Sequence, residues 1–219
     1  MPSTFLDAPS TCESCVFGKQ TWTPVPKKRE EGLGDKAMRK LGKVWIDLTG
    51  PTHVKSRNGN TYIMNILDDF TDLAWSIPLP DKSSAYSRLK KWEIAHENET
   101  GLNVGIYRVD NGELKSDQMA GWLRSRGIQQ EFTAPYTSAH NGHVEQLHRT
   151  LMGKTRAMRS YTKLPPNLWE DLYLTATHLH IRTLARSNDK TPFEKWHERK
   201  PDYSYMQEIG SDVYVLILN

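Results

Sequence analysis

The stretch Val44-Trp45-Ile46-Asp47-Leu48 is short and apolar, and Gly50-Pro51 follows it, so it predicts a β-strand that carries one acid. Two further apolar runs, Thr61–Leu67 and Leu73–Leu79, come close behind it. Asn58-Gly59 between the first two runs is a typical hairpin turn. Three consecutive strands with short connections predict an antiparallel meander.

The rest of the chain alternates between helical and strand patterns. Apolar spacing predicts helices over 82–98, about 116–125, about 143–161 and about 167–187. Short apolar runs predict strands over 104–109 and 127–132. The residues expected on the buried faces of the first and last helices are Tyr86, Leu89, Trp92, Ala95, Leu168, Leu172, Ala176 and Leu179. This order predicts an α/β fold with a mixed five-stranded sheet flanked by helices.

The composition is that of a polar globular protein. Of 219 residues, 37% are hydrophobic and 25% are charged, which is enough for one sizeable domain with flanking segments. No apolar run approaches the length of a transmembrane helix, and the first residues lack the pattern of a secretory signal. With two cysteines in a single pair, we expect an intracellular protein and no disulfide scaffold.

Cys12 and Cys15 form a Cys-x-x-Cys turn that resembles half of a zinc site. Tetrahedral zinc needs four ligands, and no His or Cys precedes Cys12, so an unmetallated pair in a tail is an equally good interpretation. The charged residues from Lys19 to Lys40 read as a linker.

A polar, turn-rich segment, Thr133–Glu145, leads into the third predicted helix. It places the carboxylate of Glu145 at the helix start, where any acid is favoured by the helix dipole. Arg149, Arg156 and Arg159 fall on the side of this helix that carries Glu145. Such arginines can be a solvated face, but a basic line of this kind also suits a phosphate backbone, and we favour the second interpretation.

Three acids stand at matching places in the predicted fold. Asp47 and Asp110 lie at strand ends, and Glu145 lies at a helix start. Carboxylates so arranged suit Mg²⁺, which prefers oxygen ligands, and two such ions can catalyse phosphoryl transfer without a protein nucleophile. Because the chain has 26 acids, chemistry alone does not single out these three.

An ordered set of short motifs resembles the integrase of copia-type LTR retrotransposons. The motifs, in chain order, are Cys12-x-x-Cys15-x-x-Gly18-Lys19, Asp47-Leu-Thr-Gly-Pro51, Leu67-Asp-Asp-Phe70, Asp110-Asn-Gly112, Thr133-Ala-Pro-Tyr-Thr137, His140-Asn-Gly-x-Val-Glu145, Thr191-Pro-Phe193 and Lys200-Pro201. Each motif is weak alone, but their order is specific. The family pattern has one residue more between Gly112 and Glu113, which puts the turn beside Asp110 in question.

The resemblance implies a ribonuclease-H-like fold and a catalytic, metal-binding triad of Asp47, Asp110 and Glu145 with Mg²⁺ or Mn²⁺. It also implies that the chain joins element DNA ends to target DNA, acts as a homo-oligomer in the nucleus, and contacts DNA through Asn141. Asp68 and Asp69 match a position that is not a metal ligand, so we expect them to cap a strand end. RNA could bind the same basic surface.

The domain organisation expected from these motifs has three parts: a remnant of a zinc-binding region with its linker over 1–40, the catalytic core over 41–163, and a helix with the start of a following segment over 164–219. We expect the sequence to be a piece of a longer polyprotein. Two other functions remain open: a non-catalytic nucleic-acid-binding relic of an integrase, and a ribonuclease-H-like nuclease.

Overall fold

A five-stranded mixed sheet forms the centre of the molecule, and its strands run in the order β3-β2-β1-β4-β5. The computed structural model describes residues 36–109, 114–132, 142–184 and 189–212. The strands are β1 (Lys43–Thr49), β2 (Tyr62–Asp68), β3 (Ala74–Leu79), β4 (Ile106–Val109) and β5 (Gln129–Phe132). The first three are antiparallel, whereas β4 is parallel to β1 and β5 is parallel to β4. The predicted meander and mixed α/β sheet are confirmed.

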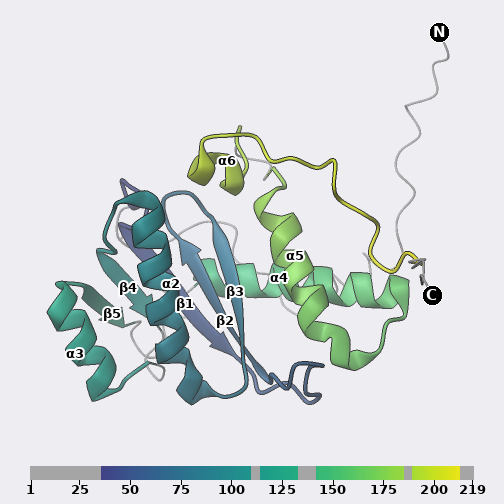
Figure 1. Cartoon of the computed structure of the whole chain (residues 1–219), viewed down its shortest axis with the longest axis horizontal. Coiled ribbons are helices and arrows are strands. Elements are labelled where there is room, and N and C mark those ends of the chain that lie inside the picture. The colour runs from purple at the N-terminus through teal and green to yellow at the C-terminus, as the bar shows by residue number, and fades with distance from the viewer. Residues whose placement is uncertain (1–35, 110–113, 133–141, 185–188, 213–219) are drawn as a thin grey trace, which may run out of the picture.

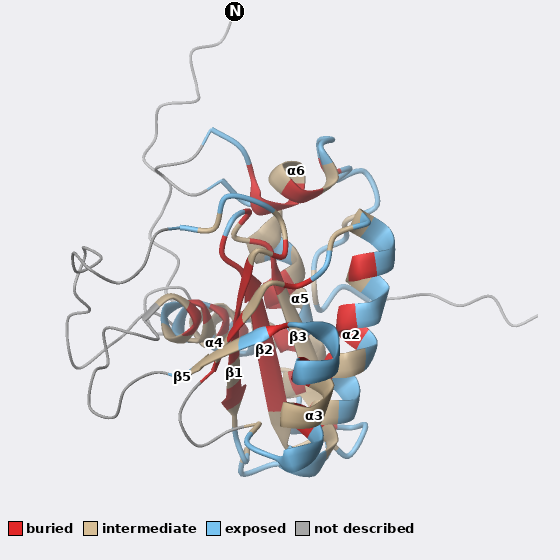
Figure 2. Cartoon of the chain, turned by 90° about the vertical axis from the view of Figure 1, so that its left-hand side faces the viewer, coloured by how far each residue is buried: buried red, intermediate tan, exposed pale blue. Residues whose placement is uncertain are grey.

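Helices cover both faces of this sheet (Figure 1). They are α2 (Ala85–Thr100), α3 (Asp117–Arg126), α4 (Gly142–Thr162), α5 (Trp169–Ile181) and α6 (Pro192–His197), with short 3₁₀ turns at Lys82–Ser84 and Pro166–Leu168. Figure 2 shows the sheet edge-on, with α4 on one side and α2 and α3 on the other. The side of the sheet that carries α4 and α5 is called here the α4/α5 face.

Alternation along β1 divides the core into two layers. Val44, Ile46 and Leu48 belong to the cluster that packs against α2 and α3. Trp45 belongs to the other cluster, with Val144 of α4. Because successive side chains on a strand point to opposite faces, Asp47 projects to the same face as Trp45, the α4/α5 face.

The first helix buries acids that the sequence pattern did not predict. Ala95 is exposed, whereas Glu93 and Glu97 are buried. Glu93 accepts hydrogen bonds from the Tyr107 hydroxyl (2.7 Å) and the Trp122 indole (3.2 Å), so its burial is offset by polar partners. Burial raises the pKa of Glu93.

The last predicted helix, over 167–187, was too long. The α-helix α5 ends at Ile181, where Arg182 N–H turns back to the carbonyls of His180 and Leu179. Leu179, expected to be buried, is 37% exposed. A separate helix, α6, which was not predicted, begins at a capping box of Thr191 and Glu194 and buries Trp196 against the sheet cluster.

Asp68 and Asp69 have the structural role expected of them. Asp68 is fully buried and accepts hydrogen bonds from the amides of Leu41 (2.8 Å) and Thr71 (2.8 Å) and from the Thr71 hydroxyl (2.6 Å). Asp69 accepts from the Trp45 indole (2.9 Å). Both acids tie the end of β2 to neighbouring segments, which is the capping role expected from sequence.

Candidate active site

Asp47 lies on β1, the central strand, and its side chain is half-buried on the α4/α5 face. Its Oδ2 accepts a hydrogen bond from the Thr49 hydroxyl at 3.2 Å. Just beyond, Gly50 adopts φ +138°, and a Cβ there would lie 2.7 Å from the Thr61 carbonyl oxygen. Only glycine therefore suits this close turn immediately after the acid.

Glu145 lies in the first turn of α4, and its side chain is 39% exposed. The buried side of this helix carries Val144, Leu147 and Leu151, and it packs on the α4/α5 face. The start of α4 also contacts β1 directly, because the His143 ring stacks on Trp45 with centroids 5.7 Å apart. This contact brings the start of α4, which carries Glu145, against β1, which carries Asp47.

The position of Asp110 lies outside the described residues, as do the turn at 110–113, Asn141, Cys12 and Cys15. The last described residue of β4, Val109, pairs with Ile46, the residue immediately before Asp47. Among the residues that the structure describes, no three His, Cys, Asp or Glu side chains form a group that could hold a metal ion. The described part of the site therefore consists of Asp47 and Glu145.

The arginines predicted to line α4 are all exposed. Arg149 Nη2 lies 3.7 Å from Glu145 Oε2, one helical turn away. Arg156 and Arg159 line a hollow of about 450 Å³ together with Lys163, at the far end of the helix. One side of α4 thus carries positive charge from the site to the carboxyl end of the helix.

Two features of the site were missed from sequence. Arg108 on β4 holds its guanidinium 4.9 Å from the Trp45 ring centroid, which puts another cation on the Asp47 side of the sheet. Asn65, on β2, is fully buried and pairs in register with Asp47. An asparagine in the middle of the apolar run Thr61–Leu67 was the signal that could have indicated it, because buried amides need partners.

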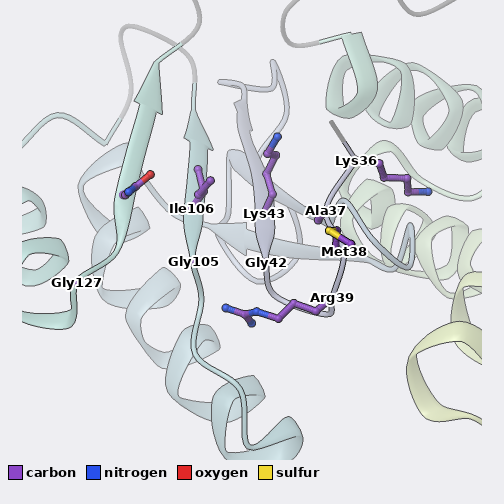
Figure 3. Close-up of a pocket in the computed structure, with 10 residues that line it drawn as sticks. Lys36, Ala37, Met38, Arg39, Gly42, Lys43, Gly105, Ile106 and Gly127 are labelled. Carbon is purple, nitrogen blue, oxygen red and sulfur yellow. The ribbon is translucent and has the colours of Figure 1, made fainter. Parts of the chain in front are cut away.

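A larger hollow, of about 910 Å³, lies elsewhere on the molecule (Figure 3). It is bordered by Lys36, Arg39 and Lys43 and lies where β1, β4 and β5 begin. Asp47 is near the opposite end of β1, so this hollow is not part of the candidate site. None of the described helices combines the length and the hydropathy that crossing a bilayer requires.

Comparison with known proteins indicates the family of the chain. Residues 38–138 match the family described as Integrase core domain. The chain is 31% identical over 201 residues to the Retrovirus-related Pol polyprotein from transposon TNT 1-94 of Nicotiana tabacum, and 23% identical over 207 residues to that from transposon RE1 of Arabidopsis thaliana. These alignments cover 91% and 93% of the chain but only 15% and 14% of the polyproteins.

A solved structure shows the same fold. It is the cryo-EM structure of the simian T-cell lymphotropic virus intasome in complex with PP2A regulatory subunit B56 gamma. One chain of that complex superposes on this chain with a TM-score of 0.61 and is 18% identical to it. The superposition covers 82% of this chain and 63% of that one. The expected ribonuclease-H-like fold is confirmed, and the chain contains an integrase core domain of the retrotransposon type.

Proposed function

We propose that this chain is the catalytic core of a DNA strand transferase that joins the 3′ ends of element DNA to a target. The observation that carries the proposal is the contact between β1, which carries Asp47, and the start of α4, which carries Glu145 and a side lined with arginines. The integrase core family and the retrotransposon relatives support it. Asp110 completes the proposed triad by its match to the family motif.

The donor set suits a hard divalent cation. Asp47 and Glu145 offer carboxylate oxygens, which are hard ligands, and both residues are only partly buried. Bound Mg²⁺ or Mn²⁺ would supply charge stabilisation for the attacking and leaving oxygens of an in-line displacement. Asp47, Asp110 and Glu145 would hold it. We further propose that Asn141 contacts the element DNA ends.

The reaction exchanges one phosphodiester bond for another. The 3′-hydroxyl oxygen of the element end attacks a target phosphorus, and the bond from that phosphorus to the target 3′ oxygen breaks. The departing oxygen takes up a proton and becomes a target 3′-hydroxyl, so no external energy source is needed. The role of Arg149, Arg156 and Arg159 is to bind phosphates and hold the DNA along α4.

The proposal is tested with a branched DNA that mimics the joined product, because its resolution does not require the natural end sequence. The protein should resolve this DNA with Mn²⁺ or Mg²⁺ and stop when EDTA is added. Salt-sensitive binding without resolution would instead support the non-catalytic relic. Cleavage of an RNA–DNA hybrid without resolution of branched DNA would support the nuclease.

The division into segments 1–40, 41–163 and 164–219 remains a proposal, as do a homo-oligomeric state, nuclear location, RNA binding and a zinc site at Cys12 and Cys15. The chain spans about a seventh of the polyproteins that it matches, so partners of those polyproteins are not assigned to it.

A further inference from the structure

Asn65 is the buried polar residue closest in register to Asp47. The two residues are paired across β1 and β2, so their side chains project to the same face of the sheet. Asn65 has no exposed surface and lies in an otherwise apolar run of β2. A buried amide in such a place is expected to have specific hydrogen-bond partners.

The partners of Asn65 come from three other elements. Its Oδ1 accepts from the Ser76 hydroxyl of β3 (2.9 Å) and from the Tyr173 hydroxyl of α5 (3.2 Å). Its Nδ2 lies 3.4 Å from Nδ1 of His148, on α4. Tyr173 OH is also 2.9 Å from the same His148 nitrogen, so Asn65, Tyr173 and His148 form a closed triangle of contacts.

This triangle links the two proposed catalytic acids. His148 comes one helical turn after Glu145, whereas Asn65 is the strand partner of Asp47. The charge of Asp47 also acts on Tyr173: burial raises the pKa of this phenol, and Asp47 raises it further. Tyr173 is fully buried, so its hydroxyl stays protonated and acts as a donor.

We propose that Asn65, His148 and Tyr173 are positioning residues, which fix α4 against β2 and so set where Glu145 stands relative to Asp47. This inference rests on the proposed function for its catalytic consequence, but not for its structural one. Apolar contacts of Val144 and Leu147 favour burial of α4 without fixing its position along the sheet, because dispersion contacts have little direction. Hydrogen bonds at defined distances add that direction.

The state of His148 fits this role. Asn65 Nδ2 can only donate, so Nδ1 of His148 accepts and the ring proton is on Nε2. Burial lowers the pKa of His148, and the neighbouring Arg149 and Arg156 lower it further. His148 is therefore neutral at pH 7, and its Nδ1 lone pair faces Asn65 Nδ2 and the Tyr173 hydroxyl, whose single proton is shared between Nδ1 and Asn65 Oδ1.

The test uses two tyrosines that are equally buried on opposite faces of the sheet. Tyr173→Phe removes only the hydroxyl of the triangle. Tyr107→Phe removes the hydroxyl that donates to Glu93, on the face covered by α2 and α3, and is the matched control. Both rings are 0% exposed, so both variants keep their apolar packing. His148→Gln, with His178→Gln of α5 as its control, is the second pair.

Two measurements are made on each folded variant: hydrogen exchange of the amides of 144–150, and Mn²⁺-dependent resolution of branched DNA. Tyr173→Phe and His148→Gln should accelerate exchange in this first part of α4 by about ten-fold. They should also lower kcat by about ten-fold or more, with KM for DNA nearly unchanged, because small misplacements of catalytic groups are costly. The control variants should change neither.

Unchanged exchange and kcat in Tyr173→Phe and His148→Gln would overturn the positioning role, as would equal changes in the controls. If exchange accelerates only in the triangle variants while the wild-type protein resolves no DNA, the positioning of α4 stands and the proposed function fails. The two conclusions are therefore separated by one set of samples.

Discussion

Arg149 Nη2 lies 3.7 Å from Glu145 Oε2, within one turn of α4 and at the surface. An exposed pair of this kind contributes little to stability. Its consequence is electrostatic, because the proposed metal ligand lies beside the first cation of the side proposed to bind DNA. Arg149 is thus placed to partner the carboxylate in one state and a phosphate in another.

The arginines of α4 should account for part of the salt dependence of DNA binding. We expect Arg149→Ala, Arg156→Ala or Arg159→Ala each to weaken binding to any DNA sequence and to lower the slope of log affinity against log salt by about one. Fluorescence anisotropy at several salt concentrations measures this slope. Arg88→Ala, an exposed change on α2 at the other face, is the control. A slope unchanged in all three variants would remove α4 from the DNA interface.

Asp68 and Asp47 are both strand acids, but they should behave differently when neutralised. Asp68→Ala leaves two amides and a hydroxyl without their acceptor, and should lower the free energy of unfolding by about 2–4 kcal/mol. Asp47 is only half-buried, so Asp47→Asn should change the free energy of unfolding by less than about 1 kcal/mol. Denaturant unfolding measures both. A larger loss for Asp47→Asn would make that acid structural rather than catalytic.

Acidification should destabilise the fold through partly buried histidines. Burial lowers the pKa of His180 from 6.5 to about 4, so the folded state keeps this ring neutral while the unfolded chain protonates it. The resulting loss of stability develops as pH falls from about 6.5 to about 4 and reaches at most about 3 kcal/mol. His148, His178 and His197 shift in the same direction.

The measurement for this effect is the free energy of unfolding at pH 7 and pH 5. His180→Gln should reduce the difference between the free energies of unfolding at the two pH values. His53→Gln, at an exposed site, should leave that difference unchanged. Equal pH dependence in His180→Gln and the wild-type protein would show that His180 does not contribute to the loss of stability at low pH.

Helix α6 should stabilise the fold although it follows the sheet by a long stretch of chain. Trp196 is 3% exposed, packs its ring edge-on to Trp75 at 5.0 Å, and donates to Glu99 at 3.0 Å. Trp196→Ala should lower the free energy of unfolding by about 3–5 kcal/mol. Tyr203→Ala, at a half-exposed ring nearby in sequence, should cost much less. Comparable losses would mean that α6 is not part of the core.

The strand meander and the acids at its ends could be predicted from sequence because apolar runs and turn residues are local signals. Apolar periodicity could not predict the burial of Glu93, because that burial depends on its hydrogen bond from Tyr107. It could not predict the packing of α6 either, because that packing depends on the contact of Trp196 with Trp75. The capping box of Thr191 and Glu194 was a readable local signal for α6. For the site, the resemblance of the motifs indicated Asp47 and Glu145, whereas the contacts of Asn65 with His148 and Tyr173 depend on packing between distant segments.

The central claim is that Glu145 and Asp47 act together in metal-dependent strand transfer. The most direct test compares Glu145→Gln with the wild-type protein in Mn²⁺-dependent resolution of branched DNA, at equal concentrations of folded protein. The variant keeps the size of the side chain and loses the charge that a divalent cation requires. We predict that its unfolding curve matches that of the wild type while its activity falls below about 1%. Wild-type activity in Glu145→Gln would contradict the account.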